Sequence, residues 1–148
     1  MPSAMELALE QAGRAQARGE VPVGAVLLDA AGAVLAAAGN EVEARHDPTA
    51  HAEILVLRAA AALRRSTRLE DCDLYVTLEP CAMCAAAISF ARIRRLYYGA
   101  YDPKGGAVEH GARFFTLSTC HHKPELYGGI EEQRAAALLK EFFLSLRG

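Results

Sequence analysis

The sequence predicts an α/β fold in which helices cover both faces of one mixed sheet, so that the chain forms three α/β/α layers. Two observations support this fold class. Four segments with apolar residues at helical spacing alternate with short runs rich in β-forming residues. The first two runs flank the turn sequence DAAG and predict an antiparallel hairpin, whereas helices connect the later runs and predict parallel pairing.

Local signals justify each element in turn. Ser3 and Glu6 form a capping box that begins the first helix, and Pro48 and Pro80 fit the starts of the second and third. The stretch DLYVTLE is rich in β-formers and predicts a strand. Glycines interrupt the pattern within 101–129, so this region is predicted to be irregular, with one helical turn near 107–113. The predicted elements are helix 3–18, hairpin strands 21–29 and 33–40, helix 48–64, strand 73–79, helix 80–91, strand 94–100 and helix 131–147.

The composition indicates a single globular domain spanning residues 1–148, because 52% of the residues are hydrophobic and 23% are charged. No apolar run reaches the roughly 18 residues that a membrane span needs. The N-terminus has no basic region followed by an apolar stretch, as a secretory signal would. We therefore expect a cytoplasmic protein that does not enter a membrane.

The net charge of −2 argues against a general nucleic-acid-binding protein but leaves room for a local basic patch. Arg92, Arg94 and Arg95 flank the strand that leads to Asp102, and Lys104 follows that strand. These basic residues are candidates for phosphate contacts.

One histidine and two cysteines have the spacing of a zinc site. Cys81 and Cys84 share one helical face in the first predicted turn after Pro80, where unpaired N–H groups and the helix dipole stabilise thiolates. His51 falls in the first turn of the preceding predicted helix. Three protein ligands leave the fourth tetrahedral position of zinc open, which is typical of a catalytic centre.

Glu53 lies two residues after His51 and suits the proton carrier that a zinc-activated water needs. On an ideal helix these two side chains would point roughly 200° apart. They serve one site only if that site lies off the end of the helix, where first-turn side chains converge.

Other interpretations of the cysteines stay open. A fourth protein ligand would close the metal site and make it structural, and the candidates are Cys72, Cys120, His121 and His122. The Cys-His-His run lies in a weakly structured stretch, which favours packing, hydrogen bonding or substrate contact. A Cys81–Cys84 disulfide in a structural protein is a further alternative, disfavoured in a chain without export features.

HAE at one helix start and PCxxC at the next form the zinc nucleobase-deaminase signature H-x-E…P-C-x-x-C. The chain resembles the bacterial tRNA-specific adenosine deaminases along almost its whole length. HAE and PCxxC are shared by all cytidine-deaminase-like enzymes, whereas HDPTAHAE, GAYDPKGGA and LLKEFF are similar to segments typical of the tRNA branch.

The resemblance implies a cytidine-deaminase-like fold with a mixed sheet of roughly five strands, one Zn²⁺ per subunit and a homodimer. It implies hydrolytic deamination of adenosine to inosine at the wobble position of a tRNA anticodon, in the anticodon arm of an arginine tRNA with an ACG anticodon. His51, Cys81 and Cys84 would bind the zinc. Glu53 would be the catalytic proton shuttle, which serves N1 of adenine and then the leaving amine.

The same resemblance implies the substrate contacts. Asn40 matches an asparagine that hydrogen-bonds the flipped base. Asp102 matches an acidic residue near the backbone of the preceding nucleotide, where a bond to a 2′-hydroxyl would help distinguish RNA from DNA. The residues that would shape the pocket are Pro22, Val23 and Ala100.

Two other functions stay open. One is a deaminase of a free base or nucleoside, guanine or cytidine, within the same superfamily; the other is a non-catalytic zinc-stabilised RNA-binding module. An open groove with Arg92, Arg94 and Asp102 at its rim would favour RNA, whereas a lid over the pocket would favour a free base. A structural zinc site would have no use for Glu53.

Overall fold

The computed structural model describes residues 2–147, so the predicted domain limits, residues 1 and 148, lie outside the described range. Every helix and strand predicted outside the irregular region 101–129 is present within that range. The observed elements are α1 Ala4–Ala17, β1 Gly24–Leu28, β2 Val34–Gly39, α2 Val42–Arg45, α3 Ala52–Arg64, β3 Asp73–Leu78, α4 Ala82–Ala91, β4 Arg95–Ala100, the 3-10 helix η1 Phe114–Thr116, β5 Glu125–Tyr127 and α5 Glu132–Arg147.

The strands form one mixed sheet in the order β2-β1-β3-β4-β5. β1 pairs antiparallel with both β2 and β3, whereas β3 with β4 and β4 with β5 pair in parallel. The hairpin, the parallel helix-connected pair and the five strands implied by the resemblance are therefore confirmed.

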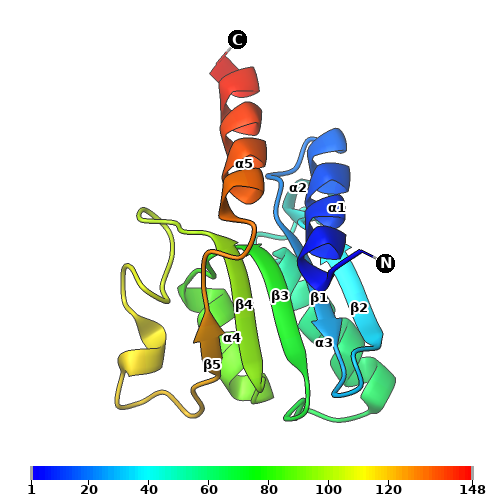
Figure 1. Cartoon of the computed structure of the whole chain (residues 1–148), viewed down its shortest axis with the longest axis vertical. Helices are drawn as coiled ribbons and strands as arrows, with labels where there is room; N and C mark the ends of the chain where they lie inside the picture. The colour runs from blue at the N-terminus through cyan, green and yellow to red at the C-terminus, as the bar shows by residue number, and fades with distance from the viewer. Residues whose placement is uncertain (1, 148) are drawn as a thin grey trace.

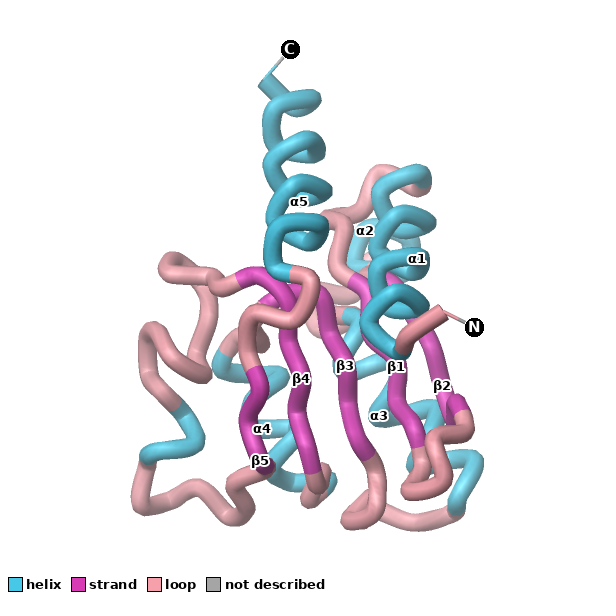
Figure 2. The backbone as a smooth tube through the Cα atoms, viewed as in Figure 1, coloured by secondary structure: helices cyan, strands magenta, loops and turns pink. Residues whose placement is uncertain are grey.

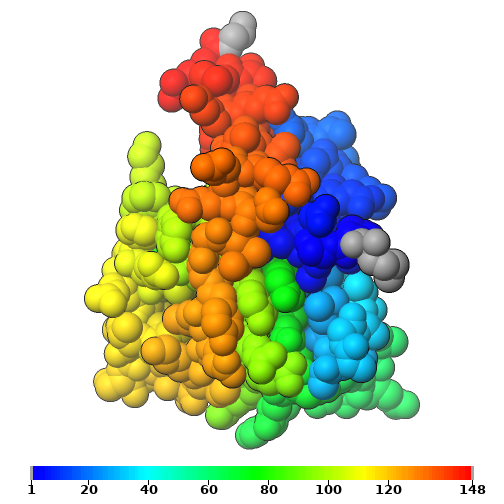
Figure 3. All heavy atoms as spheres, in the orientation of Figure 1, coloured from blue at the N-terminus to red at the C-terminus, as the bar shows by residue number. Residues whose placement is uncertain are grey.

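Helices cover both faces of this sheet, with α1 and α5 on one face and α3 and α4 on the other (Figure 1, Figure 2). Side chains of β1 alternate between the two cores: Ala25 and Leu27 pack in the core that includes α3 and α4, and Val26 packs in the core that includes α1. The C-terminal part of α5 projects beyond the body of the molecule (Figure 3). None of the helices within residues 2–147 combines the length and apolar character of a membrane-spanning segment.

Two paired glycines let α1 lie close against the hairpin. Gly24 of β1 is in register with Gly39 of β2. A Cβ atom on Gly24 would lie 2.0 Å from the carbonyl oxygen of Ala8, and one on Gly39 would lie 2.6 Å from the carbonyl oxygen of Gln11. Both distances are too short for any side chain, so the close helix–sheet contact requires glycine at these two positions.

The directions of the strands decide where the loops meet. Because β1 is antiparallel to β2 and β3, the residues before β1 share a sheet edge with the residues after β2, β3 and β4. That edge carries Val23, Asn40, Glu79 and Asp102. Segments that are far apart in the sequence are thus brought together at one edge.

Two helices begin later than predicted, which corrects the expected starts at residues 48 and 80. α3 begins at Ala52 and α4 at Ala82, because His51 and Cys81 keep an extended backbone and act as N-caps. The segment before α3 instead holds the short α2 and a turn in which Asp47 Oδ1 accepts hydrogen bonds from the N–H (2.9 Å) and hydroxyl (2.7 Å) of Thr49.

The region 101–129 is more ordered than predicted. Its helical turn lies at Phe114–Thr116 rather than at 107–113, and Glu125–Tyr127 forms β5. A stack of tyrosines supports this short strand: the ring centroids of Tyr75 and Tyr97 lie 4.2 Å apart, and those of Tyr97 and Tyr127 lie 4.9 Å apart. The stack crosses β3, β4 and β5 on one face of the sheet, so cross-strand contacts add to the backbone pairing.

Candidate active site

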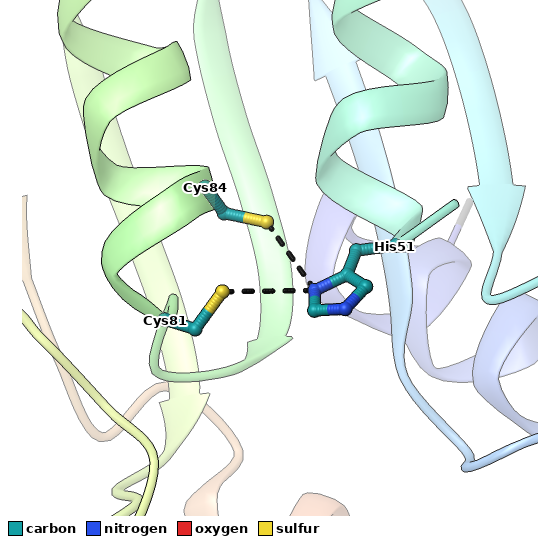
Figure 4. Close-up of side chains that lie close together, drawn as sticks. All are labelled: His51, Cys81 and Cys84. Carbon is teal, nitrogen blue, oxygen red and sulfur yellow. Dashed lines mark hydrogen bonds between the residues drawn. The ribbon is translucent and has the colours of Figure 1, made fainter. Parts of the chain in front are cut away.

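Three metal-ligating side chains converge where α3 and α4 begin. His51 Nδ1 lies 3.6 Å from Cys81 Sγ and 3.5 Å from Cys84 Sγ (Figure 4). All three donor atoms lie within 4.8 Å of one another, and within residues 2–147 no fourth His, Cys, Asp or Glu joins them.

These spacings fit a tetrahedral zinc ion. With Zn–N near 2.05 Å and Zn–S near 2.3 Å, a tetrahedral N···S edge is about 3.6 Å long. The measured separations of 3.6 and 3.5 Å match that edge. One imidazole and two thiolates are the donor set that zinc prefers, so the residues present fit this ion and leave one coordination position free of protein.

The backbone at the two helix starts aims these side chains at the cluster. His51 (φ −72°, ψ 151°) is the N-cap of α3 and Cys81 (φ −73°, ψ 175°) the N-cap of α4, and neither side chain caps its own helix. The sequence places both residues in the first helical turn, and the structure corrects this by placing each of them directly before its helix. Because His51 is the N-cap and has an extended backbone, the angle of roughly 200° expected between His51 and Glu53 on an ideal helix does not apply. The two side chains can therefore face one site.

The electrostatics of the site favour bound cations. Hydrogen bonding to Cys84 and then to His51 lowers the pKa of the Cys81 thiol to about 4. The same contact with Cys81, together with burial, raises the pKa of the Cys84 thiol, so the two sulfurs share one proton. A divalent cation would displace that proton, because metal ligation requires both cysteines as thiolates.

Glu53 lies beside the cluster as a buried carboxyl group with 4% exposure. Burial raises the pKa of Glu53 to about 7. His51, Glu53 and Cys81 line one cavity of about 630 Å³. A carboxyl group whose pKa lies near neutrality can both accept and release protons there.

Three of the five predicted substrate contacts, Val23, Asn40 and Asp102, line this cavity. Ala100 is buried at the end of β4, where its carbonyl oxygen accepts a hydrogen bond from the Glu79 N–H at 2.8 Å. Among the described residues, neither Ala100 nor Pro22 is part of the cavity lining.

Asn40 also completes the N-terminus of α3. Its Oδ1 accepts a hydrogen bond from the Ala52 N–H at 2.8 Å. Asn40 therefore supplies the capping acceptor that His51 does not provide. No described residue accepts a hydrogen bond from the amide nitrogen of Asn40, which leaves this donor for a ligand in the cavity.

Two buried carboxylates near the cavity were not anticipated from the sequence. Glu20 accepts hydrogen bonds from the backbone N–H groups of Glu43 (3.0 Å) and Ala44 (2.8 Å), which holds the start of α2. Glu79 accepts hydrogen bonds from the segment after β4. The partners of both carboxylates lie more than 20 residues away along the chain, so no local pattern could identify them.

Arg92 and Arg94 do not share a rim with Asp102, so the arginine rim that would favour RNA is not formed by the described residues. Arg94 binds Asp73 through two hydrogen bonds of 3.0 Å, and Arg95 contacts Asp73 and Glu125. Arg92 and Arg94 line a separate hollow, and Arg94 precedes the start of β4, whereas Asp102 follows its end. Lys104 does lie near Asp102.

Hydrogen bonds hold the Cys-His-His run, residues 120–122, against α4. The buried Ser89 hydroxyl accepts a hydrogen bond from the His122 N–H at 2.9 Å and contacts Cys120 Sγ at 3.5 Å. His122 Nε2 lies 2.8 Å from the carbonyl oxygen of Ile93. Cys72 is fully buried before β3. Within residues 2–147, none of these residues joins the cluster of His51, Cys81 and Cys84.

Known proteins match both the sequence and the fold. Residues 2–100 match the cytidine and deoxycytidylate deaminase zinc-binding region. A tRNA-specific adenosine deaminase from Agrobacterium fabrum (strain C58) is 60% identical over 144 residues, which cover 97% of this chain and 93% of that protein. A solved structure from work on A-to-I editing by tRNA:A34 deaminases at the wobble position of transfer RNA has a TM-score of 0.89 and 60% identity, covering 92% of this chain and 98% of the other.

A guanine deaminase from Nitrosomonas europaea shares the fold at lower identity. Its structure has a TM-score of 0.74 and 25% identity, and the match covers 94% of this chain and 80% of that chain. The identity to the tRNA deaminases is thus more than twice as high. With the zinc-binding region matched and the relatives covered almost end to end, the chain belongs to the family of tRNA-specific adenosine deaminases, zinc-dependent enzymes of the cytidine-deaminase-like fold.

Proposed function

We propose that this chain converts adenosine to inosine at the wobble position of a tRNA anticodon, by hydrolysis that consumes water and releases ammonia. The observation that carries the proposal is one cavity lined by His51 and Cys81 of the metal-ligating cluster and by the buried carboxyl group of Glu53. The 60% identity to a tRNA-specific adenosine deaminase supports the substrate class.

We assign the zinc ligands to His51, Cys81 and Cys84. Zinc bound there would supply a Lewis acid that lowers the pKa of water to about 7. Glu53 is the proton carrier: with a pKa of about 7, its carboxylate takes a proton from water and delivers it to N1 of adenine. The carboxylate then takes the second proton of the added water from the hydroxyl group on C6 and brings it to the exocyclic amine, which leaves as ammonia.

Asn40 and Asp102 are the proposed substrate-recognition residues. The free amide nitrogen of Asn40 can donate to a ring nitrogen of the base while its oxygen stays engaged with Ala52. Asp102 Oδ1 accepts hydrogen bonds from the N–H groups of Lys104 (3.2 Å) and Gly105 (3.0 Å). Oδ2 of Asp102 remains available for a 2′-hydroxyl group of the RNA.

The shape of the site favours RNA over a free base. The cavity adjoins a second hollow of about 820 Å³, and the two share Leu78, Asp102, Phe143 and other residues. This groove continues along α5 to Lys104 and Arg147, whose charges suit phosphate groups. A free base would leave most of such a groove empty.

We further propose a homodimer. α4 carries no charged side chain, and Phe90 on this helix is 63% exposed. A helix that is apolar on all sides is usually buried, so the outer face of α4 suits a second copy of the chain. An arginine tRNA with an ACG anticodon is the proposed substrate, and the cytoplasm, where tRNA is used, is the proposed location.

An inosine assay on an RNA hairpin with an ACG anticodon tests the function. We expect wild-type protein to form inosine and Glu53→Gln to reduce kcat by about 10²–10⁴-fold with its zinc content unchanged. Glu70→Gln, an exposed carboxylate in an ion pair with Arg68, is the matched control and should keep full activity. Hairpin binding without inosine formation would instead indicate a non-catalytic RNA-binding module, and turnover of free guanine or cytidine alone would indicate a free-base or nucleoside deaminase.

A further inference from the structure

Glu79 is a buried acid for which the proposed reaction has no chemical use. It directly follows β3, two residues before Cys81, and its side chain has no exposed surface. Five donors surround its carboxylate: Oε1 accepts from the Asp102 N–H (3.0 Å) and His110 Nδ1 (2.8 Å), and Oε2 accepts from the N–H groups of Val108 (3.1 Å), Glu109 (2.9 Å) and His110 (3.1 Å). Consecutive N–H groups that converge in this way form an anion-binding nest, here filled by a side chain of the same protein.

The segment 102–110 wraps tightly around this carboxylate. A Cβ atom on Gly106 would lie 2.5 Å from Glu79 Cδ and 2.6 Å from the carbonyl oxygen of Asp102. The Ala107 N–H donates to the carbonyl oxygen of Pro80 at 2.8 Å. The segment is therefore fitted to the strand end that leads directly into the zinc ligand Cys81.

This segment carries the groups proposed to meet the RNA backbone. Asp102 and Gly105 line the zinc cavity, and Lys104 lines the adjoining hollow. Because the Asp102 N–H is itself held by Glu79, the carboxylate determines how far these groups lie from the zinc ligands.

We propose that Glu79 is a positioning residue which holds the segment 102–110 against the zinc site, so that Asp102 and Lys104 are preorganised for the RNA backbone. The inference rests on the proposed function for its substrate. It assigns Glu79 no contact with the reacting atoms: the carboxylate acts through the loop. Preorganised contacts to the backbone bind substrate and transition state alike, so their loss raises KM and leaves kcat largely intact.

The test compares Glu79→Gln with wild type. The glutamine amide presents N–H groups to backbone N–H donors, and at least two of the five hydrogen bonds are lost. We expect KM for the ACG hairpin to rise about tenfold, kcat to fall less than about threefold, and zinc content to stay at one per chain. Amide hydrogen exchange at residues 108–110 should become at least about tenfold faster. Glu125→Gln, an exposed carboxylate bonded to Tyr127 at the far end of the sheet, should change none of these values.

Two further variants disturb the same contact without altering the neighbour of the zinc ligands. Gly106→Ala pushes the segment off the carboxylate and should raise KM in the same way as Glu79→Gln. His110→Ala removes one donor and keeps the four backbone donors, so it should raise KM by about twofold to threefold. A graded series, with His110→Ala milder than Gly106→Ala and Glu79→Gln, supports positioning.

The outcomes separate this inference from the proposed function. KM within twofold of wild type in both Glu79→Gln and Gly106→Ala would overturn the positioning role, as would equal losses in kcat and zinc content. If wild-type protein forms no inosine, the proposed function fails, and hydrogen exchange then decides whether Glu79 holds the segment. Unchanged amide hydrogen exchange at residues 108–110 in Glu79→Gln would refute the role of Glu79 in holding the segment.

Discussion

The capping of α3 by Asn40 makes a quantitative prediction. Asn40→Ala removes the acceptor of the Ala52 N–H, and Ala52 has no exposed surface. A buried N–H without a partner costs about 1–3 kcal/mol. We expect the free energy of unfolding to fall by about 2 kcal/mol, which for a chain of this size lowers Tm by about 4–8 °C.

The assay is denaturant and thermal unfolding of zinc-loaded protein at a fixed zinc concentration, since bound metal itself adds stability. Asn40→Asp keeps the acceptor and places a carboxylate at a helix N-terminus, where negative charge is favourable. It should therefore be more stable than Asn40→Ala. Both variants lose the amide donor, so both should lose deamination of the hairpin.

Ser3→Ala is the matched control, because Ser3 caps α1 by accepting from the Glu6 N–H at 3.2 Å in an exposed capping box. It should cost about 1 kcal/mol and leave deamination intact. An unfolding free energy for Asn40→Ala within about 0.5 kcal/mol of wild type would refute the capping role, since solvent or another group would then satisfy the Ala52 N–H.

Three further predictions concern zinc, pH and α5. His122→Ala should lose about 1 kcal/mol of stability but keep one zinc per chain by elemental analysis; reduced zinc would make His122 a ligand. Hydrogen bonding to Arg64 lowers the pKa of Asp71 to about 2, so its stabilisation is present above pH ~4 and is lost as the pH falls toward 2. Because Asp71 is 45% exposed, the stability difference between wild type and Asp71→Asn should be below about 1 kcal/mol at pH ~5. The difference should vanish near pH ~2. A stability difference that does not change with pH would contradict this prediction. Phe142→Ala should cost about 3 kcal/mol and Phe143→Ala less than about 1 kcal/mol, since their exposed fractions are 8% and 47%; equal losses in chemical denaturation would argue against this packing of α5.

Helical spacing, apolar runs, turn signals and β-forming composition together were sufficient to predict every helix and strand with at least five residues. The elements that these signals missed are α2, η1 and β5, which have four, three and three residues. Elements this short contain too few residues to display a period. Distant contacts stabilise them instead: the Glu20 carboxylate holds α2, and the Tyr97–Tyr127 stack supports β5.

The cluster of His51, Cys81 and Cys84 could be predicted because its signal is local. The HxE and PCxxC motifs each span the start of a helix, so the two helix starts can face one ion. The exact cap positions could not be predicted, because the extended backbone at His51 and Cys81 depends on packing at the sheet edge.

The surroundings of the triad depend on strand direction, which no single motif encodes. Arg94 and Arg95 are close to Asp102 in sequence, but they lie before and at the start of β4, whereas Asp102 follows its end. The six residues of β4 span about 20 Å at roughly 3.3 Å per residue. The groups that donate hydrogen bonds to the Glu79 carboxylate lie 23 to 31 residues further along the chain. The chain reaches them only after the helix crossover that connects β3 to the parallel strand β4. Such contacts become visible only when the sheet is assembled.

X-ray absorption at the zinc K-edge tests the central claim most directly, because it counts the atoms around the metal. A catalytic site built by His51, Cys81 and Cys84 predicts two sulfurs at about 2.3 Å, one imidazole nitrogen at about 2.0 Å and one further light atom that is not an imidazole. A third sulfur or a second imidazole in the purified protein would mean that the protein fills the fourth position, and the hydrolytic function would be contradicted.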